Sequence, residues 1–431
     1  MIQLISPLIR RAGFIVALGV VVGSSAQAQL PVTRAEAERA ALSAGTRVAL
    51  ARADTAAAIA RLLTARALPN PTLAASYSKS VPQQHLTLEI PVFDALWKRG
   101  IVVGQASASA RASRLLFASE RLAALVEVDT TYTRALAADA RFRLSRQTAR
   151  DADSLRQMTV SRRDAGDASD LDVDLATVVA GQQLNVASDD SLTYMSTLLT
   201  VQALMGIPAD SVAIVLADSL SIASADTLIE RRTLDSTGTA LNLPPAIAGT
   251  PQASGIGGTP SVAAAQANLT AAELAVGVQR RNVLSLPSVN VGAEWGDPGE
   301  PGLLPTFGVS MPLPIFGRNQ GPIAEATAER ERARIQLVSV RLTVRQRLIE
   351  GVRERDVLIA KVARDRDLVV RAQRVADRSL TAYREGAQGL PAVLEARRSA
   401  REVLGQFIDD LAALLTVNTE LRALTQTVPV P

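Results

Sequence analysis

The 431-residue chain has no cysteine, one histidine and only 3% aromatic residues. Without cysteine it cannot form a disulfide, a thiolate metal site or a lipid-modified N-terminal cysteine. One histidine and scattered carboxylates do not assemble a metal cluster, so we expect no enzyme activity, no cofactor and no metal site. So few aromatic side chains argue against a thick globular core. The abundant alanine instead favours thin helices that pack closely.

The chain also lacks a large excess of charge of either sign. The chain carries 46 Lys and Arg against 42 Asp and Glu, a formal net charge of +4. This near balance gives no electrostatic basis for binding nucleic acid.

Residues 1–28 have the pattern of an export signal. Arg10 and Arg11 precede a nine-residue apolar run, Phe14–Val22, which is too short to span a bilayer, and Ala26-Gln27-Ala28 is a cleavage pattern. Cleavage would remove two Arg and no acid, leaving 44 basic and 42 acidic residues. We therefore expect an exported protein that is not a lipoprotein.

The remaining chain has the same organisation twice, about 220 residues apart, which is a period larger than that of solenoid repeats. We call residues 29–207 the first repeat and 260–426 the second. Each is predicted to contain a helix (32–67 in the first), a β-hairpin and a long helical pair. Residues 208–259, rich in Ser, Thr, Ala, Gly and Pro, predict an irregular connector, and 427–431 form a short tail.

The two predicted hairpins span residues 70–93 and 287–316, where apolar and polar side chains alternate. Transmembrane β-barrels use such strands, and so do soluble hairpins with one buried face. The single histidine, His85, lies on the polar face, where we interpret it as a polar residue facing a lumen. Trp97 and Trp295 lie near strand ends, consistent with an interfacial aromatic belt or with ordinary packing.

Two Pro-free stretches, 101–165 and 323–385, predict helices of about 65 residues and on the order of 100 Å. They end at Gly166 and Gly386, where glycine lets the chain turn back into the helices predicted at 171–205 and 391–424.

The two turns are the best candidate site for binding a partner. We predict a docking surface made of Gly166, Gly386, Ala387 and Leu390, since small residues allow a partner helix to approach closely. The acids Asp167 and Asp170 fit two interpretations equally. They can begin a helix, or they can form an acidic ring at the entrance of an oligomeric channel.

Four strands cannot close a barrel, and open edges in hydrocarbon are costly. If the strands face lipid the chain must oligomerise; a dimer would supply eight strands and a trimer twelve.

The strand-to-helix junctions carry a family resemblance. Ile90-Pro91-Val92-Phe93-Asp94 with Lys98-Arg99-Gly100 resembles the first such junction of the outer-membrane efflux protein (TolC-like) family. Met311 to Gly321, including Gly317, Arg318, Asn319 and Gly321, resembles the second, in particular that of the family's heavy-metal (cobalt–zinc–cadmium) branch. The resemblance implies a mainly α protein with membrane β-structure, namely a homotrimer whose 12-stranded outer-membrane β-barrel continues as a long periplasmic α-helical barrel.

The resemblance also implies a function. Such a protein is the exit duct of a tripartite efflux system, embedded in outer-membrane lipid. It works with a periplasmic adaptor and an inner-membrane pump of the resistance-nodulation-division or ATP-driven type, and it passes heavy-metal cations or drugs. Two alternatives are a periplasmic adaptor and a structural coiled-coil protein of the envelope.

Overall fold

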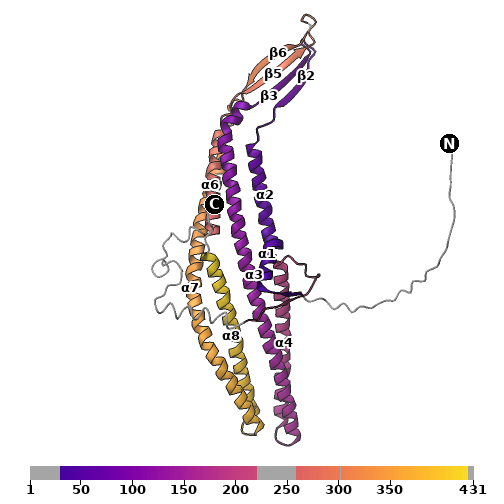
Figure 1. The fold of residues 1–431 in the computed structure, drawn as a ribbon, viewed down its shortest axis with the longest axis vertical. Helices are drawn as coiled ribbons and strands as arrows, with labels where there is room; N and C mark the ends of the chain where they lie inside the picture. The colour runs from indigo at the N-terminus through magenta and orange to yellow at the C-terminus, as the bar shows by residue number, and fades with distance from the viewer. Residues whose placement is uncertain (1–29, 221–258, 301, 426–431) are drawn as a thin grey trace, which may run out of the picture.

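The computed structural model describes residues 30–220, 259–300 and 302–425. The predicted export signal, most of the predicted connector (221–258) and the predicted tail therefore lie outside the described residues. The described chain is long and thin, with a four-stranded sheet at one end and two helical tips at the other (Figure 1). Within the described ranges, no helix is both long and apolar enough to cross a membrane.

The shaft is a wall of helices. Near the tips its order is α4 (Asp170–Leu204), α3 (Val92–Asp164), α8 (Leu390–Thr425) and α7 (Gln320–Arg384). Nearer the sheet, α2 (Thr46–Arg66) and α6 (Pro260–Arg281) take the places of α4 and α8. The 73 residues of α3 span roughly 110 Å. The wall therefore has two flanks, one formed by α2 and α4 and the other by α7 (Figure 1).

The start of α3 lies earlier than the sequence predicted. The helix begins at Val92 and not near residue 101. Gly100 and Gly104 lie within it, where a side chain would meet open space. An isolated glycine weakens a helix by only about 1 kcal/mol relative to alanine, so these two do not interrupt so long a helix.

The single helix predicted over residues 32–67 was wrong. Residues Leu30–Val32 form strand β1, and α1 (Arg34–Ala44) and α2 are separate helices that break at Gly45. A Cβ at Gly45 would collide with the carbonyl oxygen of Ala41, which explains why glycine stands at the break. Thr33 begins α1 with a reciprocal capping box to Glu36, a signal that was readable in the sequence.

Strand β1 pairs in parallel with β4 (Ile214–Leu216), in a region that was predicted to be irregular. The prediction of an irregular connector was therefore wrong for residues 214–216. The partners lie more than 180 residues apart, and three residues are too few to show a β-pattern by themselves.

The main sheet has the order β2 (Thr72–Tyr77), β3 (Gln84–Ile90), β5 (Ser288–Trp295), β6 (Leu304–Ser310), with all neighbours antiparallel. Paired residues share a face, and the register joins apolar residues in common rows. One such row is Leu73, Leu88, Val291 and Phe307, whereas the adjacent row is Thr72, Glu89, Asn290 and Gly308. The sheet thus has one apolar and one polar face, as the alternation indicates.

The last strand is shorter than the alternation suggested. Strand β6 ends at Ser310, although alternating residues continue to Ile315. Pro312 and Pro314 have no N–H to donate to a ladder, which accounts for the early end. The apolar face of the sheet is uncovered: Phe307 is 79% exposed. In this four-stranded sheet, β2 and β6 are the edge strands.

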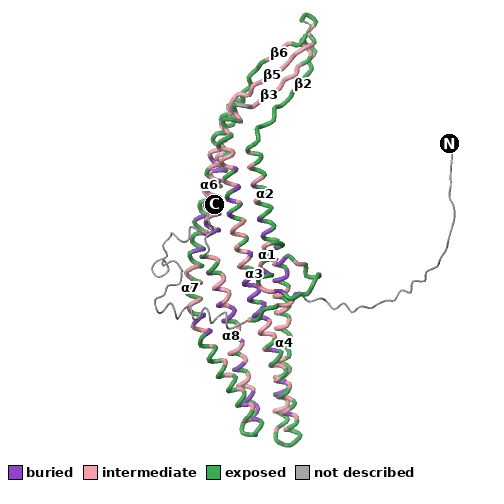
Figure 2. Tube along the Cα trace, in the orientation of Figure 1, coloured by how far each residue is buried: buried purple, intermediate pink, exposed green. Residues whose placement is uncertain are grey.

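Buried residues follow the seams between helices and do not form one central core (Figure 2). One such seam joins α7 and α8. Its buried residues are Leu358, Ile359, Val362, Phe407, Leu411, Leu414, Val417 and Leu421.

Candidate functional site

Each long helix ends in the same turn. At the first tip Gly166 has φ +86°, and the N–H of Asp167 donates to the carbonyl of Arg162 at 2.8 Å. At the second, Gly386 has φ +75°, and the N–H of Ala387 donates to the carbonyl of Ala382 at 2.8 Å. This is the Schellman arrangement, and it needs a left-handed residue that only glycine adopts without strain.

The acids after Gly166 have different roles in this structure. Ser169 is the N-cap of α4, and its N–H and hydroxyl donate to Asp172 Oδ2 at 3.1 and 2.8 Å. Asp170 is the first helical residue, with Oδ1 3.9 Å from Arg163 Nη1. Asp167 and Asp170 are both exposed. The cap therefore uses Asp172, and the two predicted ring acids remain at the surface of the tip.

The two tips are bound to one another. The Tyr383 hydroxyl of α7 lies 3.1 Å from Oγ1 of buried Thr159 in α3. Arg162 donates to the carbonyl oxygen of Tyr383, and its guanidinium lies 4.7 Å from the centre of the Tyr383 ring. A buried cluster adds Leu155, Ala176 and Val393. The tips thus form one packed unit, which reasoning from the sequence did not foresee.

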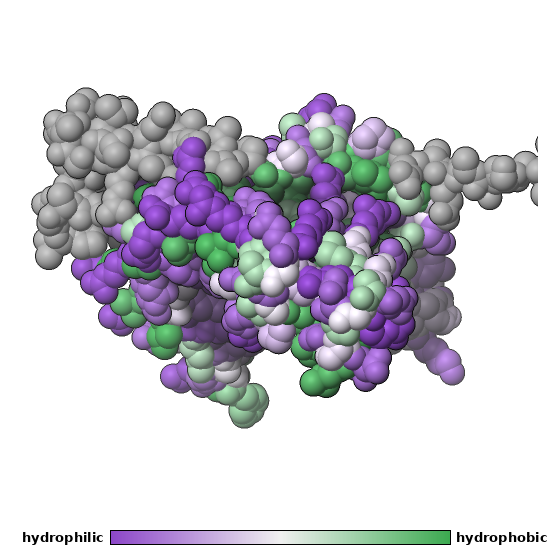
Figure 3. Space-filling view, turned by 90° about the horizontal axis from the view of Figure 1, so that it is seen from below, coloured by the Kyte–Doolittle hydropathy of each residue, from purple (hydrophilic) through white to green (hydrophobic). Residues whose placement is uncertain are grey.

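The position of Leu390 contradicts its predicted place in the docking surface. It is 1% exposed and packs inside this tip cluster, so it is not available to a docking partner. Its role is to hold the first turn of α8 against the first helical pair. Gly166, Gly386 and Ala387 are exposed and remain candidates for contact. Seen from the tip end, the surface mixes hydrophilic side chains with small separate apolar areas (Figure 3).

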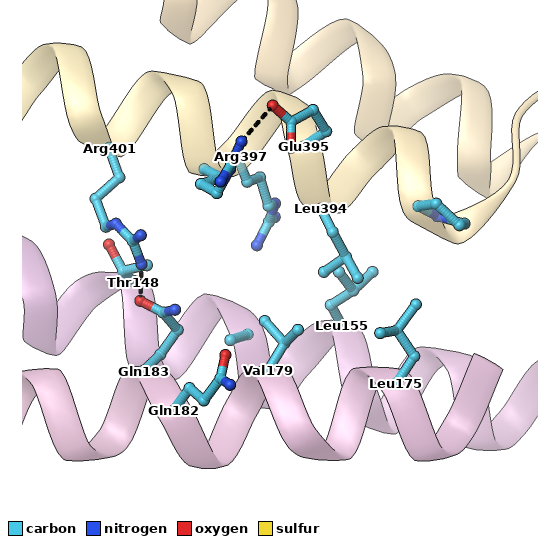
Figure 4. A pocket seen from close by; sticks show the side chains of 13 residues that line it. Thr148, Leu155, Leu175, Val179, Gln182, Gln183, Leu394, Glu395, Arg397 and Arg401 are labelled. Atoms are coloured by element: carbon cyan, nitrogen blue, oxygen red, sulfur yellow. Dashed lines mark hydrogen bonds and ion pairs between the residues drawn. The ribbon is translucent and has the colours of Figure 1, made fainter. Parts of the chain in front are cut away.

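A groove runs between the two helical pairs above the tips (Figure 4). Leu155, Leu175, Val179 and Leu394 gather at one end of it. At the other end Arg401 donates to Gln183 and joins α8 to α4. The groove is therefore apolar toward the tips and polar farther up the shaft.

The junction residues join helices to each other. Arg99 Nη2 donates to the carbonyl of Arg66 at 3.0 Å, tying α3 to the end of α2. Asn319 precedes α7 with φ 55°, and its Nδ2 donates to the carbonyl of Gln279 in α6 at 2.7 Å. Asparagine tolerates this left-handed conformation better than most residues, which explains its place here.

The other predicted junction residues shape the turn. The N–H of Arg318 donates to Gln320 Oε1 at 3.1 Å, and side chains at Gly317 or Gly321 would meet open space. Asp94, part of the first junction motif, makes contacts that the sequence did not predict. Asp94 Oδ1 lies 2.9 Å from Lys98 Nζ and accepts from the N–H of Leu286 at 2.9 Å, so it joins the two repeats.

The two tryptophans lie at opposite ends of the sheet. Trp97 is exposed at the helical end, with the Arg281 guanidinium 5.7 Å from its ring centre. Trp295 pairs with Gln84 at the far end. His85 Nδ1 lies 3.1 Å from Glu294 Oε1 on the polar face. Over the residues that the structure describes, no group of His, Cys, Asp or Glu is arranged to hold a metal ion.

Several solved structures of outer-membrane channels share this architecture. The Campylobacter jejuni CmeC outer membrane channel superposes with TM-score 0.70 at 13% identity, over 91% of this chain and 85% of that one. VceC of Vibrio cholerae gives 0.69 at 15% identity, over 91% and 96%. The open-state MtrE channel of Neisseria gonorrhoeae gives 0.60 at 13%, over 91% and 88%. At these identities the likeness establishes the fold.

One family model matches part of the sequence. No curated protein sequence matches the chain. Residues 256–426, which include the second hairpin and the second helical pair, match the family model described as outer membrane efflux protein. Through these residues the chain is similar to the outer membrane efflux protein family, whose members are channels and not enzymes, and its described residues have the fold of outer-membrane channels.

Proposed function

We propose that the chain is one protomer of a homotrimeric outer-membrane exit duct in a tripartite efflux system. The observation that carries this proposal is the open wall. One edge of the wall belongs to the first repeat (β2, α2 and α4) and the other to the second (β6 and α7). Edges of different composition favour head-to-tail association, which closes into a ring when the rotation permits.

Both flanks of the shaft carry exposed apolar stripes. On α4 the stripe is Leu184, Leu192, Met195 and Leu199. On α7 it is Ile335, Val338, Leu342, Val357, Leu368 and Val375. At 3.6 residues per turn the four α4 residues fall within roughly 80° of one helix face. Contiguous exposed apolar surface marks sites of association. We therefore assign α4 of one protomer to α7 of the next.

The sheet supports the membrane part of the proposal. Three sheets would form a 12-stranded barrel with the apolar face, including Phe307, toward lipid. The polar face, with His85 and Glu294, would line the lumen. Trp97 and Trp295, at opposite ends of the sheet, would lie near the two interfaces of the outer membrane.

The tips are the proposed contact with the rest of the efflux system. A periplasmic adaptor would bind at Gly166, Gly386 and Ala387, and a resistance-nodulation-division or ATP-driven pump would deliver heavy-metal cations or drugs. Threefold repetition would place Asp167 and Asp170 in an acidic ring at the entrance, which favours cations.

The assembly can be tested by cross-linking, because the chain contains no cysteine of its own. Leu184 and Leu368 both lie roughly 20–25 Å from their tips, counted at 1.5 Å per residue. The double variant Leu184→Cys/Leu368→Cys, treated with a short bismaleimide, should give covalent trimers. Each single variant is the control and should remain monomeric on denaturing gels. Dimers from a single variant would instead indicate a two-fold assembly and contradict the ring.

Channel function can be tested on the purified protein. We expect heat-modifiable trimers in outer membranes and discrete conductance steps in planar bilayers. Recovery in the soluble periplasm without conductance would favour the adaptor or the structural coiled-coil protein. For docking, Ala387→Trp is preferable to a change at Gly386, whose φ of +75° would strain any side chain. Ala387→Trp should abolish resistance while trimer yield stays the same; unchanged resistance would argue against docking there.

A further inference from the structure

An acidic residue stands in the apolar seam between α7 and α8. Five buried residues of α8 along this seam are Phe407, Asp410, Leu414, Val417 and Leu421, alternately three and four apart as in a coiled coil, and Leu411 lies beside them. Asp410 is 5% exposed. A charge at such a position is costly unless it is paired, so its partners decide what the position does.

Two groups from α7 face Asp410. Lys361 Nζ lies 2.7 Å from Asp410 Oδ1. Asp365 follows Lys361 by one helical turn on α7, and its carboxyl group and that of Asp410 each shift the pKa of the other. Oδ2 of Asp365 and Oδ2 of Asp410 are both buried, and neither has a hydrogen-bond partner. The seam therefore holds two buried carboxyl oxygens that lack a donor.

A single proton shared by the two carboxyl groups would supply the missing hydrogen-bond donor. Two carboxylates only accept hydrogen bonds and repel each other, whereas a carboxylic acid donates to a carboxylate. Burial raises the pKa of Asp365, and its contact with Asp410 raises it further, against smaller opposing effects of Lys361 and Arg364. Burial also acts to raise the pKa of Asp410, but hydrogen bonds from Lys361, Gln406 and Asp365 outweigh it and lower that pKa. The proton thus belongs on Asp365.

We propose that Asp365 and Asp410 form a proton-binding site that clamps α7 to α8, roughly 30 Å above the tips at 1.5 Å per residue. With the proton bound, the site is neutral overall: an ammonium on Lys361, a carboxylate on Asp410 and a carboxylic acid on Asp365. The ammonium already supplies the positive charge, so the site favours a proton over a metal ion. From α3, on the other side of α8, Arg141 is held by Asp409 at 2.7 Å and does not replace this proton.

The site makes the helical pair sensitive to pH. Asp365 keeps its proton in the folded state at pH values where it would lose it in the unfolded chain. The folded pair therefore loses stability as pH rises from the unfolded pKa through the raised pKa of Asp365. Deprotonation leaves two carboxylates in the seam, with the single ammonium of Lys361 to neutralise them.

Infrared titration of the detergent-purified full chain tests the site directly. The difference spectrum of wild type minus Asp365→Asn should show one carboxylic acid C=O band per chain, followed over a pH titration. This band should persist to higher pH than the band removed by Asp367→Asn, the matched control at an exposed acid two residues away. Equal difference spectra for the two variants would overturn the proposal.

Two further experiments distinguish the proposed site from an effect of misfolding and from binding of a metal cation. In Asp410→Asn the neighbouring carboxylate is gone, so the Asp365 band should disappear at lower pH than in wild type; an unchanged titration would refute the pair. Replacing sodium with tetramethylammonium should leave the band unaltered. If the band grew only when small cations were removed, the site would bind a metal cation and the assignment of a proton would be wrong.

Discussion

Leu192 offers the sharpest test of the proposed ring. It lies on the α4 stripe and is 66% exposed in the single chain. Burying a whole leucine side chain contributes about 1.5–3 kcal/mol, so covering two thirds of one contributes about 1–2 kcal/mol. Three equivalent contacts per trimer give about 3–6 kcal/mol. At about 1.4 kcal/mol per factor of ten, Leu192→Ser should weaken association by roughly 10²–10⁴.

The assay is size-exclusion chromatography with light scattering, over a dilution series in detergent. The variant should dissociate at concentrations where the wild type stays trimeric, and its helix content should be unchanged because the side chain is exposed. Leu303→Ser is the matched control: Leu303 is 68% exposed but lies in the loop between β5 and β6. If both variants dissociate alike, or neither does, α4 is not the contact and the reasoning fails.

Three further changes probe other parts of the molecule. Arg34→Met removes the guanidinium that pairs with Asp129, a nearly buried acid. Urea unfolding should show a free energy of unfolding lower by about 1–3 kcal/mol. Adding Asp129→Asn should restore part of this loss, and additive losses would contradict the pairing. Leu414→Ala empties a fully buried position of the α7–α8 seam and should cost about 2–5 kcal/mol, visible as a lower thermal midpoint; an unchanged midpoint would mean that the seam is not packed as described. Asp167→Asn with Asp170→Asn should reduce cation preference in planar bilayers, and unaltered selectivity would remove the acidic ring.

The sequence alone determined the elements whose signals are local. Alternation placed strands in both hairpins and assigned their faces, because a strand exposes successive side chains on opposite sides. The absence of proline predicted the long helices, and Gly166 and Gly386 marked their ends, because only glycine enters the left-handed turn without strain. The end of β6 at Ser310 could also have been predicted from Pro312 and Pro314, which cannot donate a ladder hydrogen bond.

Only the tertiary structure decided what depends on which surfaces meet. The β1–β4 pairing, the contact of Tyr383 with Thr159 and the burial of Leu390 join residues that are far apart in the chain. The buried, unpartnered Oδ2 atoms of Asp365 and Asp410 also depend on tertiary contacts. From the sequence alone, an acid in a charge-rich helix is expected to face solvent, and only the packing of a second helix buries it. A local sequence pattern determines the type of secondary structure and where it turns. It does not determine which residues of another helix or strand will pack against it.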